Sequence, residues 1–253
     1  MILKRDSSLV KNALKLKQKK YRELENKFLA EGIRFVEEAI LEGLVDHIFY
    51  SSQIYELKGN ERVLNNNIPK YEVDEKTIKE LTNTTTPQSV VAVVNKPNVQ
   101  LKNDLNFVVL VDRVQDPGNL GTIIRTCDAA KVDAVYIVKG TVDVYNDKTL
   151  RSTMGSIFHL PIVYFDSFKE AAEDLYIRGF NIYASTLDGE DVYKTDFKEK
   201  TAIVIGNEAN GMSKEDIMLC NKKIKIPMLG RAESLNASIA AAIIIYEVVR
   251  QRL

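Results

Sequence analysis

The second half of the chain repeats one pattern: a short run of apolar, largely β-branched residues, then a polar turn, then a helical stretch. Its first run, Phe107–Val114, is almost continuously apolar, which is typical of a parallel strand covered on both faces. Because strands that alternate with helices form parallel sheets, we expect an α/β fold with a largely parallel sheet. Further strands are predicted at Ala134–Val138, Leu160–Phe165, Asn181–Ala184, Ala202–Ile205 and Ile224–Ile226, and helices at Leu120–Ala130, Phe168–Arg178, Lys214–Leu219 and Ser234–Arg252.

The first half reads as a second, smaller α/β domain. Residues 96–106 are polar, contain Pro97 and lack periodicity, so they are interpreted as a linker between a domain over residues 1–95 and one over 107–253. The first domain is predicted to hold helices at 7–20, Ile33–Leu41 and Asp74–Leu81 (with Asp74 as the cap) and strands at 27–30, Val45–Tyr50 and, after Pro87, Ser89–Val94.

Composition excludes several classes of protein. The chain has no apolar run long enough to cross a membrane, and its N-terminus lacks the apolar core of a secretory signal. The two cysteines, Cys127 and Cys220, are far apart and have no neighbouring His pair, which argues against a disulfide framework and a zinc site. We therefore expect a cytoplasmic protein with no membrane partner.

The N-terminal segment is strongly basic although the whole chain has zero formal net charge. Residues 1–22 carry eight positive side chains and only Asp6 as a negative one, a balance of +7. Such density is typical of a surface that binds a phosphate backbone, but a solvated helix face would look the same. The cations are Lys4, Arg5, Lys11, Lys15, Lys17, Lys19, Lys20 and Arg22.

Residues 111–130 contain the first candidate site. Asp116-Pro117-Gly118-Asn119 has the residues of a tight turn, and Asn119 is expected to cap the helix that follows. Arg125 falls well away from the apolar face of that helix, so it is predicted either to meet an anionic ligand or to pair with Asp128 on the surface. The apolar face comprises Leu120, Ile123, Ile124 and Cys127.

Two later segments have the same construction. Gly206 ends a buried strand, and a polar loop leads to Ser213, a potential helix cap. No Gly-x-Gly-x-x-Gly occurs, which argues against NAD enzymes and the common methyltransferase fold. The last helix is apolar nearly all round, so we expect it to be buried on more than one side, with a partner subunit as the second cover. Ser234 and Asn236, at its start, are also ordinary capping residues.

Together these segments resemble the SpoU (TrmH-type) branch of the SPOUT RNA methyltransferases. The resemblance is carried by Asn119 and Arg125, by Gly206-Asn207-Glu208, and by Ile226-Pro227-Met228 with Ser234-Leu235-Asn236. The first half resembles the RNA substrate-binding domain of many bacterial members, which is similar to a ribosomal-protein fold. That match rests on Lys27-Phe28-Leu29, Glu31-Gly32, Val36-Glu37-Glu38-Ala39, Thr86-Pro87-Gln88 and Ala92-Val93.

The resemblance implies transfer of a methyl group from S-adenosyl-L-methionine to a ribose 2′-hydroxyl, without a metal, by a homodimer whose C-terminal segments form a deep trefoil knot. By position, Ser185, Gly206, Ile226 and Leu235 would bind the cofactor. The catalytic and ribose-binding set would be Asn119, Arg125, Glu208, Ser234 and Asn236. The added N-terminal domain favours 23S ribosomal RNA as the substrate, and hence a role in rRNA processing.

Alternatives remain at three points. The substrate could instead be transfer RNA, and a non-catalytic RNA-binding or ribosome-assembly protein could share the fold without needing this set of residues. Arg125 matches the residue that acts as the base in the family, yet a guanidinium normally stays protonated, so it is either a base or a positioning cation. Asn207 and the charged Arg231-Ala232-Glu233 depart from the family pattern and are expected to affect substrate choice.

Overall fold

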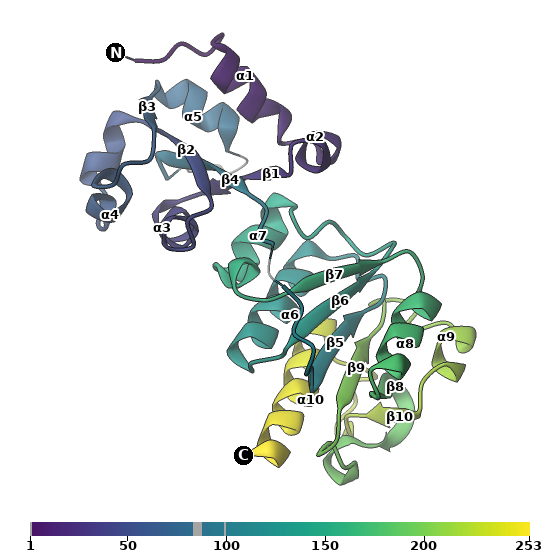
Figure 1. The fold of residues 1–253 in the computed structure, drawn as a ribbon. Coiled ribbons are helices and arrows are strands. Elements are labelled where there is room, and N and C mark those ends of the chain that lie inside the picture. Colours follow the sequence, from purple (N-terminus) through teal and green to yellow (C-terminus); the bar gives the residue numbers. More distant parts are fainter. Residues whose placement is uncertain (1, 83–87, 99) are drawn as a thin grey trace. The chain divides into compact units, whose positions relative to one another are not determined.

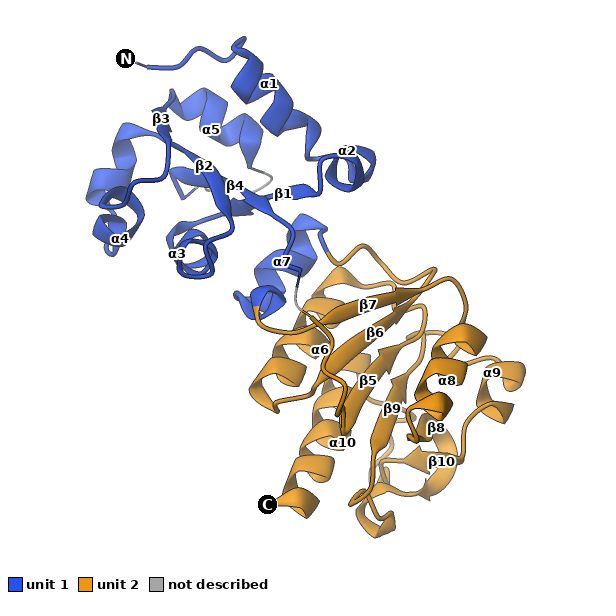
Figure 2. Ribbon diagram, in the orientation of Figure 1, with its two compact units in different colours: residues 1–98, 145–158 blue, residues 99–144, 159–253 orange. Residues whose placement is uncertain are grey.

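The computed structural model describes residues 2–82, 88–98 and 100–253, and the predicted motif residues Thr86 and Pro87 lie outside that part. Two compact units form (Figure 2): residues 1–98 with 145–158, and residues 99–144 with 159–253. The prediction placed all residues from 107 onward in the second domain, whereas in the structure residues 145–158 belong to the first unit. No helix within the described residues is long and apolar enough to cross a membrane.

The first unit is a mixed sheet of four strands in the order β1-β4-β2-β3, in which only the β2–β3 pair is parallel. The predicted helix and strand at Ile33–Leu41 and Val45–Tyr50 are confirmed, and Asp74 does cap α5. The elements are α1 (Ser8–Lys15), α2 (Lys19–Leu24), β1 (Lys27–Glu31), α3 (Ile33–Leu41), β2 (Val45–Tyr50), α4 (Asn60–Leu64), β3 (Lys70–Glu72), α5 (Glu75–Leu81), β4 (Val90–Asn95) and α7 (Asp147–Thr153), with 3-10 turns at Ser52–Glu56 and Ser156–Phe158.

The prediction of one basic helix over 7–20 is wrong, because the chain forms two short helices there. Arg22 is the physical reason. Its buried guanidinium donates hydrogen bonds of 2.8 Å to the carbonyls of Leu16 and Lys17, which lie at the C-terminal end of α1. A helix that continued through this point would use those carbonyls itself, so the buried arginine ends α1.

Aromatic packing holds the segment 145–158 in the first unit. The ring centroids of Phe28 and Tyr145 lie 5.1 Å apart, and those of Phe35 and Phe158 lie 5.2 Å apart. Burying such rings contributes on the order of 2 kcal/mol each, which is enough to stabilise a short helix such as α7 that local propensity alone would not.

The second unit is built on six parallel strands in the order β10-β8-β9-β5-β6-β7 (Figure 1), which confirms the predicted α/β class. β5 ends at Val111, three residues before the predicted end, because Arg113 adopts a positive φ of 57° that turns the chain out of the sheet. The elements are β5 (Phe107–Val111), α6 (Pro117–Ala129), β6 (Ala134–Val138), β7 (Ile162–Phe165), α8 (Phe168–Ile177), β8 (Asn181–Asp191), β9 (Thr201–Ile205), α9 (Lys214–Met218), β10 (Lys222–Lys225) and α10 (Ala237–Arg252), with a 3-10 turn at Val192–Lys194.

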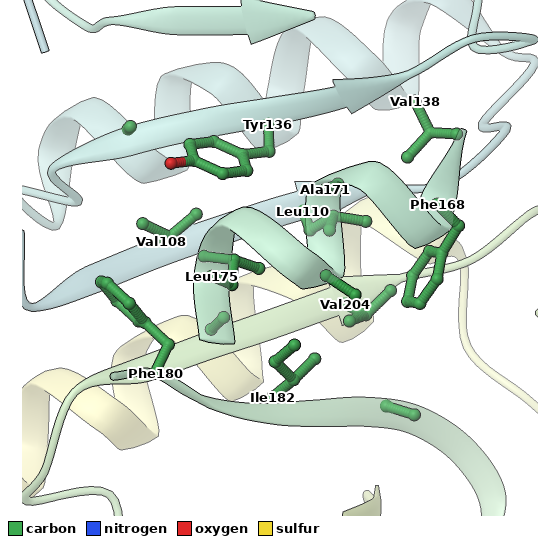
Figure 3. Close-up of a cluster of buried hydrophobic side chains, with 14 of the residues drawn as sticks. Val108, Leu110, Tyr136, Val138, Phe168, Ala171, Leu175, Phe180, Ile182 and Val204 are labelled. Atoms are coloured by element: carbon green, nitrogen blue, oxygen red, sulfur yellow. The ribbon is translucent and has the colours of Figure 1, made fainter. Parts of the chain in front are cut away.

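Helices cover both faces of this sheet. Alternate strand residues such as Val108, Leu110 and Val204 pack against Ala171 and Leu175 of α8, while α10 lies behind the strands (Figure 3). On α6, the predicted apolar face is confirmed, since its four residues are fully buried. Both faces of the six-stranded sheet are therefore shielded from solvent, as is typical of an all-parallel sheet.

One irregularity shapes the ligand-facing edge. The pairing of β10 with β8 jumps from Ala184 to Glu190 between two successive residues of β10, so residues 185–189 form an extra stretch that leaves the ladder. A Cβ on Gly189 would lie 2.5 Å from the backbone nitrogen of Ile224, so only glycine fits this close approach of two backbones. The extra stretch projects at the carboxyl end of the strand.

Candidate functional site

A cavity lies at the carboxyl ends of four neighbouring strands, β10, β8, β9 and β5. Ligands bind at this edge in open parallel sheets, because the loops that follow the strands converge there. Eight of the nine predicted site residues line the cavity, although they are spread over more than a hundred positions of the chain. They are Asn119, Ser185, Gly206, Glu208, Ile226, Ser234, Leu235 and Asn236.

Asp116, and not Asn119, caps α6, so the predicted cap is wrong. Its carboxylate accepts a hydrogen bond of 2.9 Å from the backbone nitrogen of Asn119, and Pro117 occupies the first helical position, where its missing N–H costs nothing. Asn119 therefore sits in the first helical turn with its side chain buried and free to make other bonds.

Three polar side chains from three distant segments form a continuous chain of hydrogen bonds. The Nδ2 of Asn119 donates to the Glu208 carboxylate over 3.0 Å, and the Oδ1 of Asn119 accepts from the Nδ2 of Asn236 over 2.9 Å. Because a carboxylate can only accept, Glu208 determines which way the Asn119 amide faces, and Asn119 in turn orients Asn236. The arrangement presents fixed polar groups to the cavity.

Backbone amides complete the surroundings of Glu208. The nitrogens of Gln115 and Asp116 donate to its two carboxylate oxygens, each over 3.0 Å. Partial burial raises the pKa of Glu208, but the bonds from Asn119, Gln115 and Asp116 outweigh it and leave that pKa below its usual value. The carboxylate is therefore ionised at neutral pH and joins the loop after β9 to the loop after β5.

Asn236 performs both roles that the sequence left open. Its Oδ1 accepts from the backbone nitrogen of Ser238 over 2.9 Å and so caps α10, while its Nδ2 reaches Asn119. The helix accordingly begins at Ala237 and not at the predicted Ser234. Ser234 lies outside the helix with an exposed side chain on the cavity wall.

Gly206 must be glycine for a steric reason. A Cβ there would lie 2.9 Å from the carbonyl carbon of Gly211 and from the Cγ of Met212, closer than real Cβ contacts allow. Asn207 contributes to the same tight loop, since its Oδ1 accepts from the backbone nitrogens of Ala209 and Asn210 over 3.0 Å. The 206–212 loop is therefore compact and preformed.

Arg125 is the one predicted site residue outside the cavity lining. It is exposed on α6, and the described residues include no hydrogen-bond or ion-pair partner for it. The alternative of a surface pair with Asp128 is not observed, because that carboxylate instead lies 3.3 Å from His159. Arg125 is thus a free guanidinium facing away from the core of its own chain.

Sequence reasoning missed several lining residues. Gln115 and Asp116 act through backbone amides, which no side-chain pattern reveals, although their position just after a strand was a usable signal. Thr186 and Asp188 line the cavity because the chain leaves the ladder after Ala184. The wall combines apolar side chains, glycine backbone and acidic groups, and none of its described residues is Lys, Arg or His. Such a wall suits a partly apolar, cationic ligand.

Comparison with known families gives two matches. Residues 106–246 match the model of the SpoU rRNA methylase family, and residues 7–92 match that of the MRM3-like substrate binding domain.

Relatives and solved structures agree with these matches. The chain is 38% identical over 242 residues to the 23S rRNA (guanosine(2553)-2′-O)-methyltransferase RlmP of Bacillus subtilis, covering 94% of each. It superposes on the AdoMet complex of the SpoU methyltransferase AviRb from Streptomyces viridochromogenes with a TM-score of 0.88 and 32% identity, covering 97% of this chain and 98% of that one. The AdoMet-bound rRNA methyltransferase of Sinorhizobium meliloti gives a TM-score of 0.85 and 32% identity over 100% and 98%.

Proposed function

The chain belongs to the SpoU rRNA methylase family, and on that basis we propose that it transfers a methyl group from S-adenosylmethionine to a ribose 2′-hydroxyl of 23S ribosomal RNA. The observation that carries the proposal is the cavity, where the Glu208–Asn119–Asn236 chain of hydrogen bonds joins the preformed 206–212 loop to the starts of α6 and α10. An RNA-binding protein without catalysis would not need this set of hydrogen-bonded side chains.

The cavity fits the cofactor by its chemistry. Gly206 supplies backbone where a Cβ has no room, and Ile226 and Leu235 supply apolar surface for an adenosyl group. We assign cofactor binding to these three residues and to Ser185, which directly follows the last regular pair of β8. When bound, S-adenosylmethionine supplies an activated methyl group on a sulfonium sulfur.

The protein's own part in the reaction is alignment. Asn119 and Asn236 are held rigidly by Glu208 and by the start of α10, so they can position the ribose without reorganising. The exposed Ser234 hydroxyl is assigned to the same ribose contact. Exclusion of water and fixed dipoles near the attacking 2′-oxygen supply the rest of the lowering of the reaction barrier. No residue in this set needs a metal ion.

Arg125 completes the site from the other subunit of a homodimer. It is exposed and unpaired among the described residues, and α6 packs beside α10, whose Ile239 and Tyr246 are 50% and 49% exposed. Because these apolar side chains are exposed, α10 is covered on one side only within its own chain. This supports a second copy of the chain as the cover of the other side. There Arg125 acts as a base or as a positioning cation toward the RNA.

The remaining features of the proposal follow the family. The segments around the cavity form a deep trefoil knot, residues 107–253 are the methyltransferase domain, and residues 1–95 are the RNA substrate-binding domain, joined by the linker 96–106. Ribosomal RNA as a substrate places the enzyme in the cytoplasm.

Six of the eight cations of the basic N-terminal segment separate into two groups; of the other two, Lys4 is exposed and Lys19 lies 3.7 Å from Glu23. Arg22 is buried, Lys17 donates to the carbonyls of Glu80 and Thr82 over 2.7 and 3.1 Å, and Arg5 pairs with Glu80. These three side chains stabilise the first unit. The exposed Lys11, Lys15 and Lys20 remain for RNA, and Lys15 and Lys20 each lie 5.9 Å from the ring of Tyr21, a potential stacking surface.

Replacing those three lysines together by glutamine is expected to weaken RNA binding and to lower the slope of log affinity against log salt by about two, because each phosphate contact contributes about 0.7 to 0.9. Filter-binding assays at a series of salt concentrations measure both the RNA affinity and this slope. A control triple, Lys169, Lys194 and Lys198 to glutamine, should leave the slope unchanged. An unchanged slope in the variant that replaces Lys11, Lys15 and Lys20 would show that these lysines form a solvated helix face and do not bind RNA. Deleting the segment is a poorer test, because Val10, Ala13 and Leu16 belong to the core.

The function itself is tested by methyl transfer from labelled S-adenosylmethionine to total RNA from cells lacking this protein. We expect a labelled 2′-O-methyl nucleoside in the 23S RNA fraction. Label confined to transfer RNA would overturn the substrate, and label on a base would overturn the reaction. Calorimetry with S-adenosylmethionine accompanies the assay, and absence of binding would contradict the proposal as a whole.

A further inference from the structure

Arg113 occupies an unusual place just behind the cavity. It follows β5 with a φ of 57°, a left-handed conformation that a side chain such as arginine rarely adopts, at a cost on the order of 1 kcal/mol. Its backbone nitrogen donates to the Oγ1 of Thr141 over 3.0 Å, which holds the turn in place. Arg113 does not itself line the cavity. A strained residue so close to a site invites a functional explanation.

The side chain of Arg113 joins two carboxylates. Its Nε and a terminal nitrogen donate to the fully buried carboxylate of Asp112 over 2.9 and 2.6 Å. The same terminal nitrogen reaches the carboxylate of Asp216, on α9, over 2.5 Å. A planar guanidinium can make this fork, whereas a lysine ammonium can satisfy only part of it. The bond to Asp216 links β5 to a helix 103 residues further along the chain.

The backbone carbonyl of Arg113 makes the complementary connection. The left-handed conformation turns it toward the loop after β9, where it accepts a hydrogen bond of 2.9 Å from the Nδ2 of Asn207. One residue therefore holds both ends of the stretch 207–216, at Asn207 through its carbonyl and at Asp216 through its guanidinium. Between those ends lie Glu208–Met212, all of which line the cavity.

We propose that Arg113 is a positioning residue that sets the affinity for S-adenosylmethionine by fixing the 207–216 stretch, without touching the cofactor. The inference rests on the proposed function, which supplies the ligand. A purely structural role would need only the pair with the buried Asp112, whereas Arg113 also bonds Asn207 and Asp216. The carbonyl of Arg113 accepts from two residues of the cavity wall, Asn207 and Gln115, while its guanidinium holds Asp216, beyond the far end of the wall segment 208–212. Asn207 is a departure from the small residues expected at that position.

The test uses the full-length protein and two variants, Asp216→Asn and Arg113→Lys. Asp216→Asn keeps the shape of the side chain and leaves the buried Asp112 paired, so the fold is preserved. Calorimetric titration with S-adenosylmethionine, well below the melting temperature of each variant, is expected to show about tenfold weaker binding for Asp216→Asn, the scale of a lost hydrogen bond between charged groups. The turnover rate at saturating cofactor should change much less, since the Glu208–Asn119–Asn236 chain stays intact.

A double-mutant cycle identifies the link itself. If Arg113 acts through Asp216, the double variant should bind about as weakly as the weaker single variant, because both remove one interaction. Arg178→Lys is the matched control: that arginine pairs with Asp174 over 2.8 Å on α8, and its replacement should leave cofactor affinity unchanged.

The outcomes separate this inference from the proposed function. Folded Asp216→Asn and Arg113→Lys proteins that bind S-adenosylmethionine as tightly as the unaltered chain would reduce Arg113 to a structural residue. A lowered melting temperature with unchanged affinity leads to the same conclusion. If the unaltered chain does not bind the cofactor, the proposed function fails, and this inference fails with it.

Discussion

Replacing Arg125 by alanine is expected to reduce methyl transfer by about a hundredfold or more, while the affinity for S-adenosylmethionine stays within about twofold. The reason is positional: Arg125 is exposed on α6 and does not line the cavity of its own chain, and its proposed role in the partner's site is toward the RNA and not the cofactor. Single-turnover methyl transfer and calorimetry measure the two quantities separately. Lys169→Ala, at an exposed cation on α8, is the control and should leave both unchanged.

Mixing subunits tests whether Arg125 acts across a dimer. Arg125→Ala and Asn119→Ala chains are each expected to be inactive alone, but a mixed dimer contains one intact site, made of Asn119 from one chain and Arg125 from the other. Recovery of up to about a quarter of the wild-type rate after mixing and refolding follows from random pairing of the subunits. No recovery from two folded, dimeric variants would place Arg125 in the cavity of its own chain or remove it from the reaction.

The substitution Arg125→Lys distinguishes the two roles that remain open for this residue. A lysine ammonium titrates far more easily than a guanidinium, so a base would regain activity as the pH rises. A positioning cation needs the planar fork, and lysine would then stay inactive at every pH. The pH profile of the lysine variant between about 7 and 10 therefore decides between them.

Replacing Gly206 by valine is expected to weaken S-adenosylmethionine binding by about a hundredfold or more. Even the first carbon of a side chain would lie 2.9 Å from the backbone carbon of Gly211 and 3.0 Å from the nitrogen of Met212. Because these contacts are backbone atoms of a loop held at both ends, the loop must shift away from the cavity instead of a side chain turning aside. Calorimetry gives the affinity, and thermal melts establish that the variant is folded.

The matched control for this prediction is Gly230→Ala. Gly230 lies in the loop that leads to Ser234, and a Cβ there would have open space around it. Alanine at 230 should therefore change cofactor affinity little, whereas alanine at Gly206 should already weaken it measurably. Wild-type affinity in a folded Gly206→Val protein would show that the cofactor does not use this loop.

The sequence determined most of the second unit on its own. Nearly continuous apolar runs separated by helical stretches favour a parallel sheet with covered faces, and parallel strands bring their carboxyl ends to one edge. The residues that follow β5, β9 and β10 are therefore expected to lie close together, whatever conformation the loops adopt. Glu208 and Asn119 could be placed near each other on this ground, together with the resemblance to a known family.

Local signals were less decisive where two residues competed for one role. Asp116 and Asn119 both suit a helix cap, and the choice fell to Asp116 because Pro117 sets the start of the helix. That outcome left Asn119 available for Glu208 and Asn236. A capping preference is worth only about 1 kcal/mol, so the surrounding contacts decide it.

Only the tertiary structure decided the features that depend on contacts between distant residues. Arg22 ends α1 by reaching carbonyls that a continuous helix would have used, and aromatic rings draw Tyr145 and Phe158 into the first unit. Arg113 acquires its partners at Asn207 and Asp216 in the same way. Sequence patterns report preferences that act over a few neighbouring residues, whereas these side chains bind groups that the path of the whole chain brings to them.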